Sequence, residues 1–264
     1  MRELVRGVRR ADWPPLLRAA LFGSRARGDF AASSDVDVLL LCRVGPAERT
    51  RAGEVNERLG RSIGRKAGVR LQTWTVCADD LRAGRRTPML VDALADAITV
   101  WPPGASPLRA PFTPADAVFC AERLLTWVDN GGAEARQALQ EGRWADAAAR
   151  ARDDIARLAS AALLLTGDTR HRRRGTLRRF ERRFVRTGLV PRGATRALKW
   201  AAAAYPRDGG RGQETPPVPP PLVATAPAGC ELAAALEAEL LVPLLDRMVA
   251  LRATGQWISE DDEG

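Results

Sequence analysis

The chain has 264 residues, of which 45% are hydrophobic and 28% are charged, and its formal net charge is +9. This balance predicts a globular protein of one large or two ordinary domains, and no apolar run reaches the length of a membrane span. Four scattered cysteines and a single histidine exclude a disulfide framework or a zinc site of the usual spacing, and the N-terminal segment lacks the apolar core of a secretory signal, so we expect a cytoplasmic protein.

The positive charge comes almost entirely from arginine, since only Lys66 and Lys199 are lysines. A basic face can bind nucleic acid by displacing counterions from phosphates. The same excess could also reflect coding bias in a chain rich in Ala and Gly. Charge alone therefore leaves both interpretations open.

The first part of the chain alternates between strand and helix patterns. Apolar or alternating segments predict strands, and positions spaced by about 3.6 residues predict helices. The expected strands are 16–22, 36–41, 69–76 and 97–101, and the expected helices are 46–66 and 87–96. This order predicts an α/β domain over residues 1–104, with a small mixed sheet and helices on one side of it.

The strand signal ends near residue 104, and the rest predicts an all-α helical bundle over residues 112–255. The expected helices are 114–129, 143–166, 192–205 and 230–252, with Pro243 expected to kink or break the last one. A Pro-rich loop over 206–228 is more typical of a disordered insertion than of a docking motif. Residues 256–264 are expected to form a solvated acidic tail.

The segment GSRARGDFAASSDVDVLLL, residues 23–41, carries the chemistry of the first domain. On a strand, Asp35 and Asp37 project from the same face, and paired carboxylates suit Mg²⁺, which takes its other ligands from water and substrate phosphates. The small turn at Gly23 and Ser24 offers backbone N–H groups and a hydroxyl to phosphates. Arg25 and Arg27 can add charge-assisted bonds, and Gly28 permits the bend between turn and strand.

This pattern resembles the signature of the polymerase-beta-like nucleotidyltransferases, and the resemblance extends over about residues 16–101. The matching positions are Gly23, Ser24, Arg27, Gly28, Ser34, Asp35 and Asp37. The resemblance implies a metal held by Asp35 and Asp37, and a nucleotide site built from the other five residues. It also implies transfer of a nucleoside monophosphate, AMP from ATP as the first choice, to a hydroxyl of a small molecule or a protein.

Two alternatives bear on this interpretation. The same residues could form a simple Ser/Gly turn in which Asp35 caps the chain and Asp37 is exposed at a strand start. In addition, Gln72 stands where the family usually carries a third carboxylate, and an amide cannot accept a proton at neutral pH. The second function is therefore a catalytically weak, antitoxin-like or regulatory nucleotide-binding module with a protein or RNA partner.

A general base could instead come from the helical half, as it does in kanamycin nucleotidyltransferase, which this chain resembles. The candidate carboxylates are Asp116, Glu122, Asp153 and Asp154. Asp79 and Asp80 lie just beyond the third strand and are expected to cap the helix that follows.

Residues 141–191 resemble the HEPN family of helical bundles, which often accompany small nucleotidyltransferases. HEPN ribonucleases carry an arginine and a histidine separated by four to six residues, whereas Leu164, Leu165 and Thr166 stand at the corresponding positions before His171. A ribonuclease is therefore not expected, and His171 is interpreted as a helix-start residue. Nine arginines in residues 170–186 are expected to line a cleft or form a solvated helix face, in preference to binding RNA.

Overall fold

The structure is a computed structural model that describes residues 2–10, 14–32, 34–108, 111–169, 173–203 and 218–257. The chain divides into two compact units, the first running to Pro111 and the second beginning at Phe112. His171 lies outside the described residues, as do most of the expected Pro-rich loop and most of the acidic tail.

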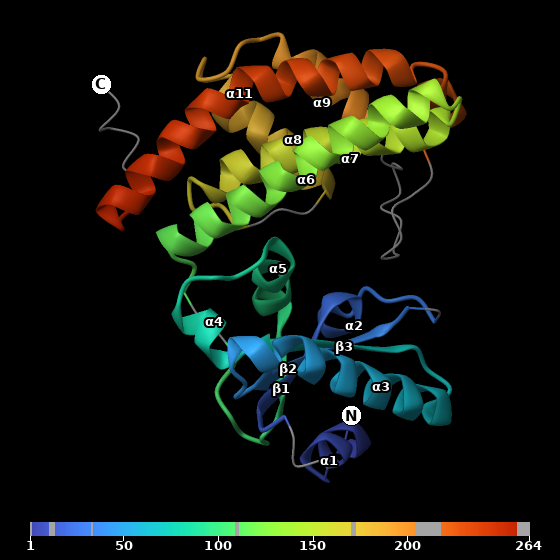
Figure 1. Ribbon diagram of the computed structural model, residues 1–264, viewed down its shortest axis with the longest axis vertical. Helices are drawn as coiled ribbons and strands as arrows, with labels where there is room; N and C mark the ends of the chain where they lie inside the picture. Colours follow the sequence, from blue (N-terminus) through green and yellow to red (C-terminus); the bar gives the residue numbers. More distant parts are fainter. Residues whose placement is uncertain are drawn as a thin grey trace. The chain divides into compact units, whose positions relative to one another are not determined.

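The first unit combines a small sheet with short and long helices, as the alternating pattern predicts (Figure 1). Its elements are α1 (Arg2–Arg10), β1 (Leu16–Phe22), α2 (Gly23–Arg27), β2 (Val36–Cys42), η1 (Pro46–Glu48), α3 (Arg49–Ala67), β3 (Leu71–Cys77), α4 (Ala78–Arg82), α5 (Pro88–Asp96) and β4 (Ile98–Trp101).

The sheet is mixed and has the strand order β3-β2-β1-β4. β1 runs antiparallel to both β2 and β4, whereas β2 and β3 are parallel and are joined by the long helix α3. A parallel pair needs such a crossover, while the antiparallel pair β1 and β2 needs only the short segment that contains α2. The expected α/β class and mixed sheet are confirmed.

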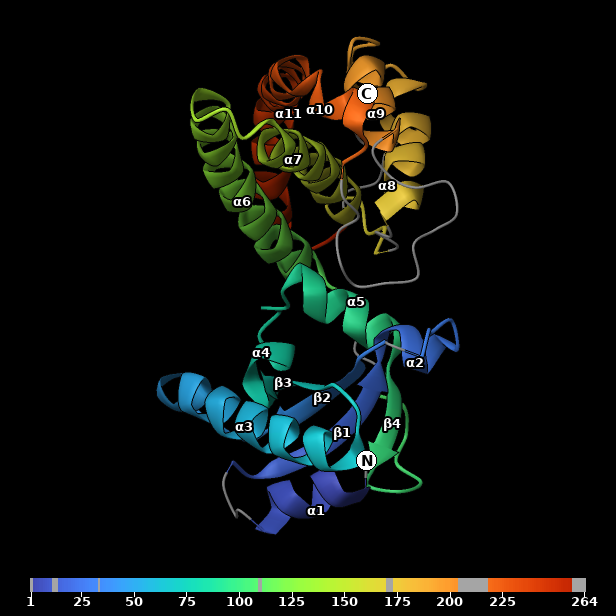
Figure 2. The same ribbon diagram turned by 90° about the vertical axis from the view of Figure 1, so that its right-hand side faces the viewer.

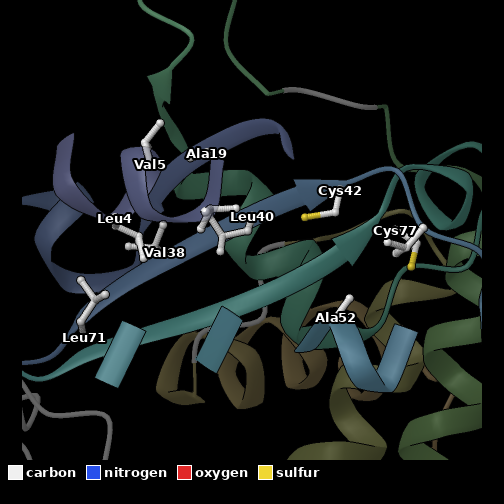
Figure 3. Packing of buried hydrophobic residues seen from close by; sticks show 11 residues of the cluster. Leu4, Val5, Ala19, Val38, Leu40, Cys42, Ala52, Leu71 and Cys77 are labelled. Carbon is white, nitrogen blue, oxygen red and sulfur yellow. The ribbon is translucent and has the colours of Figure 1, made fainter. Parts of the chain in front are cut away.

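Helices cover both faces of this sheet, so the expectation of helices on one side is wrong. On one face, Val38 and Leu40 pack with residues of α1 and α3 (Figure 3). On the other face, Leu39 and Leu41 pack with residues of α5. Because successive strand residues point to opposite faces, the unbroken apolar run of β2 requires cover on both sides.

The second unit is helical, which confirms the expected helical second half (Figure 2). Its elements are α6 (Pro114–Gln140), α7 (Trp144–Leu164), α8 (Arg173–Phe180), η2 (Glu181–Val185), α9 (Ala194–Ala203), α10 (Pro220–Val223) and α11 (Ala226–Thr254). The three long helices α6, α7 and α11 pack against one another. Among the described helices, none is both long and apolar enough to cross a membrane.

α11 continues through Pro243 as one helix, so the expected break does not occur. Proline removes one N–H donor and its hydrogen bond to the carbonyl four residues earlier. Pro243 is exposed, so the carbonyl of Glu239 that loses this bond lies on the solvent side of the helix. Buried apolar residues of the same helix, including Leu240 and Leu244, hold it across this point.

Candidate active site

Asp35 and Asp37 lie at the start of β2, on the face of the sheet that also carries Leu39 and Leu41. Asp37 stands opposite Phe22 of β1 and opposite Gln72 of β3 in the strand register. Both aspartates are buried, with 8% of Asp35 and 1% of Asp37 exposed. The interpretation of Asp37 as an exposed strand-start residue in a simple turn is therefore wrong.

Gly23 brings the small turn directly against this carboxylate pair. It begins α2, immediately after β1, and has a φ of 74°, a conformation that favours glycine. A Cβ atom placed on Gly23 would lie only 2.7 Å from Oδ2 of Asp37. The absence of a side chain is therefore what lets the turn and the carboxylate approach each other.

Asp35 is held by two side chains from the start of β3. The amide Nε2 of Gln72 donates to Oδ2 of Asp35 at 2.6 Å, and Nε of Arg70 lies 3.1 Å from Oδ1. The Arg70 side chain is 71% exposed, so solvent screens this ion pair from the arginine side, whereas its partner Asp35 is buried. Gln72 occupies the position predicted for it, next to both aspartates.

Arg25 shapes the loop between α2 and β2. Its Nη2 donates to the backbone carbonyl of Ser34 at 2.9 Å, and its guanidinium lies 4.7 Å from the ring centre of Phe30. The hydroxyl of Ser34 accepts from the N–H of Ala31 at 2.9 Å. Arg25 and Ser34 thus fix the segment that leads into Asp35.

Arg27 links this turn to α5. Its Nη1 lies 2.6 Å from a carboxylate oxygen of Asp96, and its Nε lies 3.3 Å from one of Asp29. Partial burial would lower the pKa of Arg27, but the hydrogen bonds to Asp96 and Asp29 outweigh it and raise the pKa above its usual value. Gly28 ends α2 in a left-handed conformation, with a φ of 79°.

The residues at the start of β2 fit a hard divalent cation. The two carboxylates share one face of the sheet. The space beside Asp37 is left open because residue 23 is glycine, and any larger residue there would fill it. Mg²⁺ is commonly bound by one or two carboxylates, with water and substrate phosphates completing its coordination. Asp35 can offer Oδ1 to such an ion once the exposed Arg70 withdraws.

Comparison with known protein families gives a match over the part of the chain that builds this site. Residues 2–79 match the family model of the nucleotidyltransferase domain. The match covers less than a third of the chain, from α1 to the start of α4, and includes the turn, both aspartates and Gln72. The match supports nucleotidyl transfer as the general chemistry of this part of the chain. No curated protein matches the chain.

The four carboxylates considered as bases in the helical half have separate surroundings. Asp116 completes a capping box with Thr113 at the start of α6, which accounts for its burial. Glu122 pairs with Arg252, and Asp153 lies 2.9 Å from Nε of the buried Arg152. These three are thus engaged in contacts within the second unit.

The fourth carboxylate, Asp154, has a strongly shifted pKa. Its side chain is 3% exposed and lies 2.8 Å from Nη1 of Arg157. Burial raises the pKa of Asp154 to about 7, against the opposing effect of Arg157. Its carboxylate also lies against Gly131 of α6, where a Cβ would come 2.6 Å from Oδ2.

Asp79 and Asp80 lie in the first turn of α4 but make no capping bond. The N-cap residue is Cys77, and no side-chain cap hydrogen bond is present there. Asp79 pairs with Arg82 and Asp80 with Arg49. The expected capping role is therefore wrong, although acidic residues in a first turn still favour the helix dipole.

Sequence reasoning missed Arg70 and Asp96. Arg70 stands two residues before Gln72, so strand alternation could have placed it on the same face as the aspartates. No local signal identifies Asp96, which lies 69 positions from its partner Arg27. In the arginine-rich stretch, Arg179 lies 3.3 Å from Asp168, and the proposed cleft or solvated face remains a prediction.

Proposed function

We propose that this protein is a Mg²⁺-dependent nucleotidyltransferase that moves a nucleoside monophosphate, AMP from ATP as the first choice, to a hydroxyl group. One observation carries the proposal. Gly23 and Asp37 approach so closely that a phosphate held at the turn would lie next to the carboxylate pair. A nucleotidyltransferase needs this combination of a phosphate-binding turn and carboxylates on one face.

Each residue of the turn and strand has a role in this proposal. Ser24 and the backbone N–H groups at the start of α2 bind the outer phosphates, while Asp35 and Asp37 hold the cation. When bound, the cation neutralises charge on the phosphates and aligns the attacking and leaving oxygens. Arg27 and Ser34 position the turn through their contacts with Asp96 and Ala31.

The acceptor in this proposal is a hydroxyl of a small molecule or of a protein side chain. The second unit is proposed to be a HEPN-like bundle, and the pairing of the two units resembles that of kanamycin nucleotidyltransferase.

The proposal is tested by incubating the protein with labelled nucleoside triphosphates, Mg²⁺ and a panel of hydroxyl acceptors, with pyrophosphate release as the readout. The double variant Asp35→Asn/Asp37→Asn should lose activity by at least about a hundredfold, since metal-dependent charge stabilisation is removed. The double variant Glu54→Gln/Glu57→Gln removes two exposed carboxylates of α3 and should remain active. Equal activity in all three proteins would refute the proposal.

The hydrogen bond from Gln72 to Asp35 favours a second function. An amide at this position donates to the carboxylate instead of adding a third anionic ligand. The alternative is a weakly active, antitoxin-like or regulatory module that binds nucleotide and a partner. Nucleotide binding measured by calorimetry, without pyrophosphate release on any acceptor, would support this alternative.

A further inference from the structure

Two grooves in the first unit are lined mainly by arginine. One groove, of about 460 Å³, is bordered by Arg58, Arg61, Arg65 and Arg70. The other, of about 840 Å³, is bordered by Arg2, Arg6, Arg9 and Arg10 of α1. All eight arginines are exposed.

The helices that border the two grooves, α3 and α1, form one layer on the same face of the sheet, with the first groove at the β3 edge and the second at the β4 edge. The two helices approach closely at Gly7, where a Cβ would lie 3.2 Å from a side-chain carbon of Leu59. Arg6 and Arg58 are the chain neighbours of these two contact residues. We call this surface the α1–α3 face, meaning the eight arginines that border the two grooves.

The α1–α3 face carries a large excess of positive charge. α1 has four arginines and one glutamate, and α3 has six basic and two acidic residues. Arg61 lies 3.3 Å from Glu57 in an exposed pair, which contributes little stability and can exchange for another anion. A surface of this kind attracts a ligand with several negative charges.

The larger groove, bordered by the arginines of α1, also has apolar residues at its base, and these indicate which class of anionic ligand it suits. Val5, Val100, Trp101 and Pro103 line it beside the arginines, and the Arg9 guanidinium lies 5.5 Å from the centre of the Trp101 ring. An apolar floor with a cationic rim suits a ligand that offers flat rings together with phosphates. Single-stranded nucleic acid has this chemistry, whereas the bases of a duplex are already stacked inside.

A membrane surface fits the α1–α3 face less well. Helices that bind membranes insert apolar side chains between the lipids. The apolar residues of α1, which are Leu4, Val5 and Val8, are instead buried in the core beneath the helix. Guanidinium groups, in contrast, match phosphodiester oxygens in bidentate geometry.

We infer that the α1–α3 face binds a single-stranded nucleic acid, with its phosphates on the arginines and bases on the apolar floor. Arg70 borders the first groove and also contacts Asp35, so the bound strand would reach the edge of the candidate active site. The inference goes beyond the proposed function, because binding to this face requires neither nucleotide nor cation. It departs from the sequence-based expectation, which treats nucleic acid as a possible but not a favoured partner of this protein.

The test is fluorescence anisotropy with a labelled single-stranded RNA, the DNA of the same sequence, and the corresponding duplex, measured without nucleotide. Single strands should bind more tightly than the duplex, and affinity should fall steeply between about 50 and 200 mM salt. Two triple variants each remove three arginines of one groove: Arg58→Gln/Arg61→Gln/Arg65→Gln and Arg2→Gln/Arg6→Gln/Arg10→Gln. Each should weaken binding about tenfold or more and reduce the slope of log affinity against log salt concentration by about 2. Tighter binding of the RNA or of the DNA shows which of the two nucleic acids this face prefers.

The matched control is Arg123→Gln/Arg136→Gln/Arg192→Gln, which removes three exposed arginines of the second unit. It should change affinity by less than about twofold, and circular dichroism should show all three variants folded. Equal losses in all three, absence of binding by the unmodified protein, or equal displacement of the RNA by polyglutamate would overturn the inference. Strand binding is measured without nucleotide or cation, whereas the transfer assay measures pyrophosphate release, so failure of the transfer assay and failure of this inference are separate results.

Discussion

The side-chain amide of Gln72 donates to Oδ2 of Asp35 at 2.6 Å, across the parallel pair β2 and β3. This bond stabilises one carboxylate of the candidate site in the absence of a cation. The family resemblance predicts a third acidic ligand at the position of this amide. Gln72 is therefore the residue at which stability and catalysis can be separated experimentally.

Gln72→Glu is expected to replace this bond with repulsion between carboxylates. Without a divalent cation, the variant should be less stable by on the order of 2 kcal/mol, because a third carboxylate is added beside two buried ones. With Mg²⁺ the stability should return, and pyrophosphate release should rise about tenfold or more if the missing group is a base. Thermal melting with and without Mg²⁺, followed by the transfer assay, measures both effects.

The matched control is Gln72→Leu, which loses the hydrogen bond without adding a charge. It should cost about 1 kcal/mol and show no recovery with Mg²⁺ beyond that of the unmodified protein. If Gln72→Glu and Gln72→Leu respond to the cation alike, no cation binds beside residue 72.

Gly23→Ala is expected to destabilise the first unit more than Gly28→Ala. Both glycines have positive φ values, 74° and 79°, so both substitutions incur a backbone penalty of about 1–2 kcal/mol. Only at Gly23 would the new Cβ clash, 2.7 Å from Oδ2 of Asp37, whereas nothing lies within 4 Å at Gly28. Chemical unfolding measures the free energy of unfolding of both variants, and the difference between the two values is the cost of the clash.

The same contact can be checked in a second background. In Asp37→Gly protein, the clash is absent, so Gly23→Ala and Gly28→Ala should cost similar amounts. A persistent excess for Gly23→Ala there would mean that the carboxylate is not what restricts residue 23.

Gly64→Ala and Gly53→Ala are expected to have opposite effects, although both residues lie in α3. A Cβ at Gly64 would meet the backbone carbonyl of Val69 at 2.7 Å, so the helix must move away from β3. This should cost about 1–3 kcal/mol. At Gly53 nothing lies within 4 Å, and alanine should stabilise the helix by about 0.5–1 kcal/mol. Urea unfolding of both variants checks the signs, and stabilisation by Gly64→Ala would contradict the close packing of α3 on β3.

Asp154 is expected to make the stability of the protein depend on pH. Burial raises its pKa to about 7, above the value of about 4 in an unfolded chain, so the folded state binds the proton more tightly. Its contribution is fully present below pH 4 and is lost as pH rises through 7. Between pH 5 and pH 8 the free energy of unfolding should fall by on the order of 2 kcal/mol more in the unmodified protein than in Asp154→Asn.

The measurement is chemical unfolding at pH 5 and pH 8 for both proteins. The control Asp153→Asn removes the neighbouring, more exposed carboxylate and should retain the pH dependence of the unmodified protein. Parallel pH profiles for Asp154→Asn and the unmodified protein would show that Asp154 is ionised alike in the folded and unfolded states.

The sequence by itself determined the features that depend on neighbours along the chain. Alternation placed Asp35 and Asp37 on one face of β2, and the glycine and serine spacing predicted the turn that meets them. Helical periodicity predicted the second half as a bundle, with α6 and α11 somewhat longer than expected. These features follow from backbone geometry, which repeats every two residues in a strand and every 3.6 in a helix.

Only the tertiary structure decided the contacts between segments far apart in the chain. Arg27 meets Asp96 across 69 positions, and Gln72 reaches Asp35 because β3 joins the sheet parallel to β2. Whether one or both faces of the sheet are covered, and whether Asp154 is buried, likewise depend on which helices pack together. Such contacts follow from strand order and helix packing, and these depend on burial of apolar surface over the whole unit, not on any local pattern.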